Sequence, residues 1–127
     1  MQNHKKLRVW AKAHALAIQV RRATRRFPRS NYQSLRSQLT RAAESIVLTI
    51  VEGCGASTAR EFGRFLDMAI KSTSELEEGL LLARDFGAMS HSEWERLTHE
   101  AVDIRRMLCG LRAKVLAKAA VHSGSHG

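Results

Sequence analysis

The chain has a single proline, and its eight glycines leave few breaks in 127 residues. It also lacks alternating runs of β-branched residues and the Asn-Gly or Asp-Gly pairs that close hairpins. Aromatic residues make up only 6% of the chain, whereas hydrophobic residues make up 44%. A core of Leu, Ile, Val and Ala without hairpin signals is typical of an all-α protein, and the length is that of one domain.

Only two cysteines are present, Cys54 and Cys109, and they have no CxxC spacing. They make no disulfide framework, so we expect two free thiols. The longest strongly apolar run, SIVLTIV at residues 45–51, is far shorter than the ~20 residues needed to span a bilayer. No signal peptide is visible, because Lys12 and His14 interrupt any apolar stretch near the start. We therefore expect a cytoplasmic protein with no membrane partner.

Acidic residues are absent from residues 1–43, which hold eleven of the 21 lysines and arginines. Residues 44–127 hold all twelve acidic residues and the other ten basic ones, so the net charge of +9 belongs to the first third of the chain. A positive field on one side of a protein suits a phosphate polymer or an anionic surface.

Apolar residues recur at helical spacing in four segments, and short polar stretches separate them. Pro28 ends the first segment, Asn31 is a candidate N-cap of the second, and Thr58 with Glu61 forms a capping box for the third. Connections this short favour an up-down-up-down antiparallel four-helix bundle. The predicted bundle occupies residues 1–118 and residues 119–127 are a predicted disordered tail; the helices are expected at about 5–26, 31–54, 58–86 and 91–118.

Two stretches carry a resemblance to a known family: SQLTRAAESIVLTIVEG at residues 37–53 and EFGRFLDMAIKSTSELEEGLLLARDFG at residues 61–87. They resemble the bacterial four-helix-bundle proteins encoded in intervening sequences of large-subunit ribosomal RNA genes, some of which carry ribosomal-protein names. LRVWAKAHALA and FPRSNYQSLRSQL are similar to the family's usual opening, so the resemblance covers about residues 7–116. Where the family usually has Pro, Asn and Ala, this chain has Val47, Thr49 and Val51, which predicts a straighter second helix.

The resemblance also implies an assembly. A related protein serves diversity-generating retroelements as an accessory to reverse transcriptase, and it is a basic pentameric barrel. By resemblance, we expect this chain to form a ring-shaped homo-oligomer, with five subunits as the implied number.

The residue patterns of catalysis and metal binding are missing. A di-iron bundle needs Glu-x-x-His motifs on facing helices, and Glu95 and His99 are one residue too far apart. The segment EGCGAS, residues 52–57, contains two glycines but has no lysine at the position that a phosphate-binding loop requires. His14 and His91 have no companion ligands in the pattern. We therefore expect no enzyme activity, no metal, no cofactor and no small-molecule substrate.

Two further groups flank the apolar stripes of the middle helices. The first is polar, and we interpret it as a hydrogen-bonded set between those helices or across a subunit interface, with Arg41 and Arg64 as candidate cations. The alternative is a polar site for catalysis or ligand capture. Its members are Ser45, Glu52, Ser72 and Glu75. The second group is apolar and exceeds what one inner face can bury, which predicts self-association. Its members are Val47, Leu48, Leu81 and Leu82.

The segment QVRRATRRFPRS, residues 19–30, places five arginines within nine positions without an acid. One interpretation is a phosphate-contacting strip that binds the backbone of a nucleic acid without reading its base sequence. The resemblance to the family, through its genomic associations, favours structured RNA over DNA. The other is that cations complement the end of a helix and pair with Glu93 and Glu95. The leading function is therefore a non-enzymatic nucleic-acid-binding homo-oligomer, and the alternative is a protein-interaction adaptor. The residues predicted to bind nucleic acid are Lys5, Lys6, Arg8, Lys12, Arg21, Arg22, Arg25, Arg26 and Arg29.

Overall fold

The computed structural model describes the backbone of residues 2–126 and the side chains of residues 2–121. Within that range the protein is all-α and contains no strand. A short 3-10 turn, η1, precedes four α-helices. Their bounds are His4–Lys6 for η1, Arg8–Arg25 for α1, Gln33–Cys54 for α2, Ala59–Asp85 for α3 and His91–His126 for α4.

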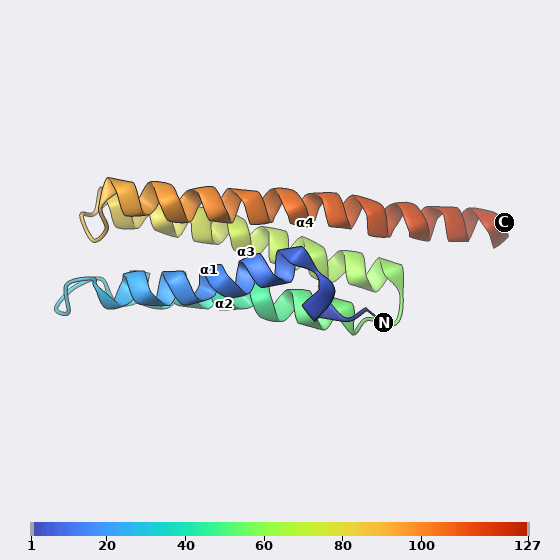
Figure 1. The fold of residues 1–127 in the computed structure, drawn as a ribbon, viewed down its shortest axis with the longest axis horizontal. Helices are drawn as coiled ribbons and strands as arrows, with labels where there is room; N and C mark the ends of the chain where they lie inside the picture. The colour runs from blue at the N-terminus through green and yellow to red at the C-terminus, as the bar shows by residue number, and fades with distance from the viewer. Residues whose placement is uncertain (1, 127) are drawn as a thin grey trace.

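Consecutive helices run in opposite directions and lie side by side (Figure 1). Helix α1 packs against α2 and α4, and α3 packs against the same two helices from the other side. All four helices contribute to one core, for example through Leu16, Ile46, Leu76 and Ile104, whose side chains are at most 2% exposed. The directions of the four helices are therefore up-down-up-down, as predicted.

Two helix–helix contacts depend on glycine. A Cβ atom at Gly79 would lie 2.7 Å from Cδ2 of Leu39, so α2 and α3 approach closely there. A Cβ atom at Gly63 would lie 2.8 Å from Cδ2 of Leu116, which brings α3 equally close to α4. Leu39 is buried in the core, whereas Leu116 is only half-buried. A larger side chain should therefore be tolerated less well at Gly79 than at Gly63.

The second helix begins with an unexpected cap. Its N-cap is Tyr32, not the predicted Asn31, and Tyr32 adopts the left-handed conformation with φ of 68°. The Tyr32 hydroxyl donates a 2.8 Å hydrogen bond to the carbonyl of Phe86, so the turn after α1 is tied to the end of α3. The third helix starts as predicted, because the Glu61 N–H donates to Oγ1 of Thr58.

The last helix differs most from the prediction. Helix α4 continues to His126 instead of ending near residue 118, so the predicted disorder of residues 119–127 is not what the structure describes for residues 119–126. Residue 127 lies outside the described residues. The physical reason is that Ala119 and Ala120 are good helix formers and no proline follows them. As Figure 1 shows, the far part of α4 extends beyond the other helices.

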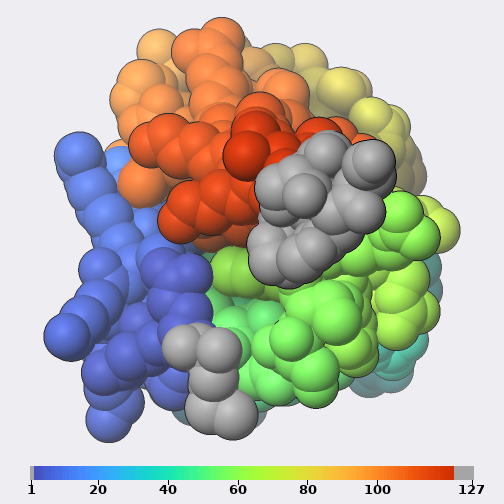
Figure 2. Space-filling model, turned by 90° about the vertical axis from the view of Figure 1, so that its right-hand side faces the viewer, coloured from blue at the N-terminus to red at the C-terminus, as the bar shows by residue number. Residues whose placement is uncertain are grey.

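The start of the chain folds back on the bundle. The Gln2 N–H donates a 2.9 Å hydrogen bond to the carbonyl of Cys54 at the end of α2, and the Asn3 side chain caps η1. Figure 2 looks onto this end, where η1 and the first turn of α1, in dark blue, lie next to the turn between α2 and α3, in green. Of the helices described, none is long and apolar enough to cross a membrane.

Candidate nucleic-acid interface

The basic residues of α1 point in different directions, and this divides the predicted binding set. Lys12 faces α4, where its Nζ lies 3.5 Å from Oε2 of Glu100 and 3.6 Å from Oδ2 of Asp103. The single ammonium is therefore shared between two carboxylates of the neighbouring helix. Lys12 holds α1 against α4 and is a poor candidate for contact with a phosphate.

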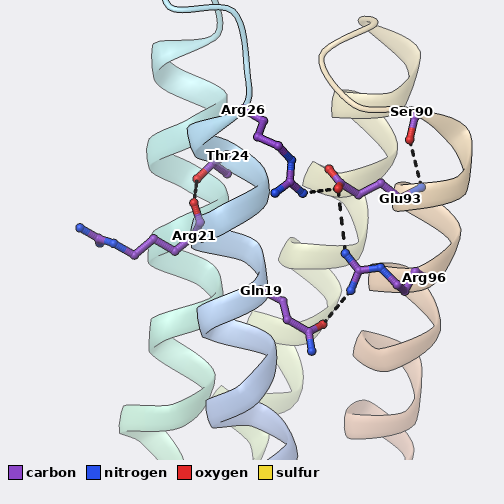
Figure 3. Close-up of polar contacts among 7 residues, drawn as sticks. All are labelled: Gln19, Arg21, Thr24, Arg26, Ser90, Glu93 and Arg96. Atoms are coloured by element: carbon purple, nitrogen blue, oxygen red, sulfur yellow. Dashed lines mark hydrogen bonds and ion pairs between the residues drawn. The ribbon is translucent and has the colours of Figure 1, made fainter.

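Arg26 also faces α4. Its guanidinium donates to Oε2 of Glu93, and Arg96 reaches the same carboxylate at 4.0 Å while donating to Gln19 at 3.1 Å (Figure 3). The predicted pairing of this segment with Glu93 is thus confirmed for Arg26. The predicted partner Glu95 lies instead 3.6 Å from Nε2 of His91.

The side chain of Arg21 projects from a different side of α1. In Figure 3 its side chain points away from the junction of α1 and α4. One of its terminal nitrogens lies 4.0 Å from Oε1 of Glu44 on α2, and both side chains are more than half exposed. A pair of this kind contributes little to stability and leaves most of the guanidinium in water.

The remaining arginines of this segment are Arg22, Arg25 and Arg29, and we call them the arginine end. All three are exposed, and no carboxylate of the described residues lies within 4.0 Å of them. Arg22 and Arg25 follow the exposed Ile18 by four and seven positions, so they share one outward stripe of α1. The neighbouring Arg36 differs, since it donates to the carbonyls of Thr24, Phe27 and Pro28 and caps α1. The arginine end is therefore available to a partner.

The lysines and arginine at the start of the chain form a second basic group. Lys5, Lys6 and Arg8 are exposed, and no ion pair joins them to a carboxylate of the described residues. Arg8 and Arg25 are separated by the full length of α1, about 25 Å at 1.5 Å per residue. The nine predicted residues consequently do not make one patch: two exposed groups lie at opposite ends of α1, and three of the nine side chains are paired.

Three rings lie beside this second group. The ring centroids of His4 and Trp10 are 5.2 Å apart, and those of Trp10 and His14 are 5.1 Å apart. We call His4, Trp10 and His14 the aromatic column. It was not predicted from the sequence; the four-residue spacing of Trp10 and His14 was the available signal, whereas the approach of His4 depends on the fold of the N-terminal turn.

One group of possible metal ligands was also not predicted from the sequence. Ligand atoms of His99, Glu100 and Asp103 lie within 4.8 Å of one another on α4. The Lys12 ammonium lies beside both carboxylates, so this group already has its counter-charge. Nothing in this arrangement favours a metal ion over the lysine.

The comparisons with known proteins agree with this fold. The family model described as 23S rRNA-intervening sequence protein matches residues 5–110. The chain belongs to this family. Among solved structures, it is similar to a protein of unknown function from the S23 ribosomal protein family of Bacteroides thetaiotaomicron VPI-5482, with a TM-score of 0.77 and 20% identity over 82% of this chain and 97% of that one. No curated protein matches the chain.

The polar set predicted from the family-like segments is only partly assembled. The hydroxyls of Ser45 and Ser72 lie 3.0 Å apart and join α2 to α3. Glu75 lies along the same α2–α3 groove as Ser45 and Arg41, while the Arg41 guanidinium donates to Ser37 at 3.2 Å. Glu52 is exposed at the end of α2, away from the serine pair. The other candidate cation, Arg64, lies over the ring of Phe65.

The four predicted interface residues occupy three different grooves in this family member. Val47 and Leu48 lie between α1 and α2 beside Ile18, in a groove of about 370 Å³. Leu82 borders the α2–α3 groove, and Leu81 borders the α3–α4 groove. Leu48 is 59% exposed and Ile18 is 43% exposed, so apolar surface is left open between α1 and α2.

Both thiols are free, as predicted. Cys54 is buried at the end of α2, and this burial raises the pKa of its thiol. Cys109 is exposed on α4. A buried thiol with a raised pKa is a poor nucleophile, so Cys54 contributes to packing.

Proposed function

We propose that this protein is a non-enzymatic nucleic-acid-binding protein that contacts phosphates of structured RNA through its arginine end and works as a homo-oligomer. The observation that carries the proposal is the exposure of Arg22, Arg25 and Arg29 without a carboxylate within 4.0 Å in the described part of the chain. Guanidinium groups present a planar fork of donors that suits phosphate oxygens.

The distribution of acids supports this interpretation. Like charges one turn apart on a helix, such as Arg22 and Arg26, repel by roughly 0.2–0.5 kcal/mol. Glu93 compensates Arg26, but the described residues offer no carboxylate to Arg22. An external polyanion is a partner that would relieve this repulsion. The family's description refers to an intervening sequence of 23S rRNA, and the similar structure comes from a ribosomal protein family, which favours RNA over DNA as that partner.

Self-association is the second part of the proposal. Ile18 and Leu48 leave apolar surface exposed on neighbouring helices. In the proposed homo-oligomer, a second copy of the chain covers this surface. Several copies would present several arginine ends to one RNA. Each phosphate contact releases counterions, so the affinity of an oligomer should depend steeply on salt.

The test compares Arg22→Gln/Arg25→Gln with the wild type in RNA binding over a salt series. We expect weaker binding to any duplex RNA and a slope of log affinity against log salt that decreases by roughly 0.7–0.9 for each phosphate that the variant no longer neutralises. The matched control is Arg26→Gln, which removes a cation that already pairs with Glu93. Equal binding by the wild type and the double variant would refute the role of the arginine end.

One observation favours the alternative, a protein-interaction adaptor. Glu75 and Glu78 border the α2–α3 groove, and no cation of the described residues lies within 4.0 Å of either carboxylate. Their spacing of three residues matches that of Arg22 and Arg25, so the arginine end of one copy would fit this groove of another. Glu75→Gln/Glu78→Gln discriminates the two functions: the adaptor requires the loss of self-association, whereas the nucleic-acid function requires unchanged or stronger RNA binding.

A further inference from the structure

The two exposed basic groups of α1 differ in the side chains around them. The group at the start of the chain, Lys5, Lys6 and Arg8, lies beside the aromatic column, in which His14 is exposed and Trp10 is half-buried. The column lies on the side of α1 that faces α2, and its last ring, His14, lines the groove that Ile18 also borders. Rings and cations are therefore close together at this end.

The arginine end has no comparable stack of rings among the described residues. Phe27 is only 2% exposed, and the Arg36 guanidinium lies 5.8 Å from its ring centroid. Tyr32 is half-buried, its ring lies 6.2 Å from that of Phe27, and its hydroxyl is bound to the carbonyl of Phe86. Phe86, the C-cap of α3, is 55% exposed, but no aromatic pair includes its ring among the described residues, so this end offers guanidinium groups and a single ring rather than a stack of rings.

Paired and unpaired nucleotides require these two kinds of surface. A duplex stacks its bases on one another and offers a protein mainly phosphates and sugars. Unpaired bases expose their faces and stack on aromatic side chains, at roughly 1–3 kcal/mol per base. We propose that the aromatic column binds unpaired nucleotides that continue from a duplex held at the arginine end. This inference rests on the proposed function and narrows its ligand to an RNA with a junction between paired and unpaired segments.

The spacing along α1 sets the length of the unpaired segment. Trp10 and Arg22 are twelve residues apart, about 18 Å along the helix axis. Nucleotides that stay stacked as in a duplex strand advance about 3.4 Å each, so about five unpaired but stacked nucleotides connect the two ends. The outward stripe between them carries Ala11 and Ala15, whose small exposed side chains leave room for a strand close to the helix.

The experiment uses the full chain and two RNA hairpins with the same duplex, one blunt and one with a five-nucleotide single-stranded tail. We expect the wild type to bind the tailed hairpin at least about 5-fold more tightly, the equivalent of one stacked base. His14→Ala should lose this preference while keeping its affinity for the blunt hairpin. The control is His91→Ala, because His91 contacts Trp94 at the same 5.1 Å centroid distance but lies away from the column.

Tryptophan emission gives a second readout. The tailed hairpin should quench the emission of the wild type, and Trp10→Phe, which keeps a ring in the column, should lose most of that quenching. Arg22→Gln/Arg25→Gln should weaken the binding of both hairpins in parallel, which tests the proposed function separately.

Three results would overturn the inference. Equal affinity of the wild type for the two hairpins would refute it and leave the proposed function intact. A tail preference that survives in His14→Ala, with only a lower melting temperature, would mean that the column merely holds η1 against α1. Failure of the wild type to bind either hairpin would refute the proposed function, and the inference with it.

Discussion

The pair of Arg26 and Glu93 separates structural arginines from functional ones. The side chain of Arg26 is 60% exposed and that of Glu93 is 20% exposed, so the pair is only partly shielded from water. Exposed pairs contribute about 0.2–1 kcal/mol, and a cation at the end of a helix adds typically 0.3–1 kcal/mol. Relief of the repulsion between Arg22 and Arg26 returns roughly 0.2–0.5 kcal/mol. We therefore expect Arg26→Gln to lower the free energy of unfolding by about 0.5–1 kcal/mol.

This destabilisation is measurable by thermal unfolding. Unfolding entropy near 2.1 cal/mol/K per residue makes 1 kcal/mol correspond to about 4 °C for a chain of this length. Arg26→Gln should therefore melt about 2–4 °C below the wild type, and the difference should shrink in 1 M salt, where the Debye length is only about 3 Å. Arg22→Gln should melt at or slightly above the wild-type temperature, because it removes repulsion and breaks no pair.

A double-mutant cycle with Glu93→Gln isolates the interaction. We expect a coupling free energy of about 0.5 kcal/mol between Arg26 and Glu93, and none between Arg22 and Glu93. If Arg22→Gln were as destabilising as Arg26→Gln, Arg22 would have a partner within the fold. The reasoning that assigns it to an external phosphate would then be wrong.

Three further predictions concern packing, assembly and thiol chemistry. Gly79→Ala should lower the melting temperature by about 4 °C, because an overpacking cost of about 1–3 kcal/mol exceeds the ~1 kcal/mol gain in helix propensity. Gly63→Ala should be neutral or stabilising, because the leucine beside it can move. Light scattering at micromolar concentration should show an oligomer of the wild type that Leu48→Glu dissociates and the control Met68→Glu, at a side chain 47% exposed against 59% for Leu48, does not; a stable 14.2 kDa monomer of the wild type would contradict this. A thiol reagent should label one cysteine per native chain and two in denaturant. Burial raises the pKa of Cys54 above its ordinary 9.0, so the unfolded chain loses the thiol proton at a lower pH than the folded chain does. The free energy of unfolding should therefore fall as the pH rises past 9. Rapid labelling of both native thiols would show that α2 ends in a more open environment.

The periodicity of apolar residues was sufficient to predict the helices, because each helix buries one continuous stripe. It failed where the outcome depends on tertiary contacts. Tyr32 caps α2 in a left-handed conformation because its hydroxyl reaches Phe86, 54 residues away. The extent of α4 was wrong for a different reason, since a polar and glycine-containing sequence was interpreted as a tail although Ala119 and Ala120 continue the helix.

The candidate site, too, could be predicted from the sequence only in part, because the role of each charged residue depends on the fold. Charge composition identified the first helix as the basic surface, but it treated nine cations as equivalent. Their roles depend on which neighbouring helix each side chain faces: Lys12 and Arg26 face the carboxylates of α4, whereas Arg22 faces water. That direction follows from the arrangement of α1 beside α4, which no window of sequence within α1 contains.

The neutralisation of α1 is therefore selective, and this selectivity is the strongest argument for a binding surface. Acids of α4, Glu93 in its first turn and Asp103 about three turns further on, compensate cations on one side of α1, and Glu44 lies close to Arg21 on another side. The outward stripe, which neither helix can reach, keeps Arg22 and Arg25 without a carboxylate within 4.0 Å among the described residues, and Arg8 at the opposite end of α1 has none either. If the basic character of α1 served the fold alone, these outward positions would gain nothing from a guanidinium group and would lose stability through repulsion. Their retention is explained when the charge is neutralised by a partner from outside the bundle.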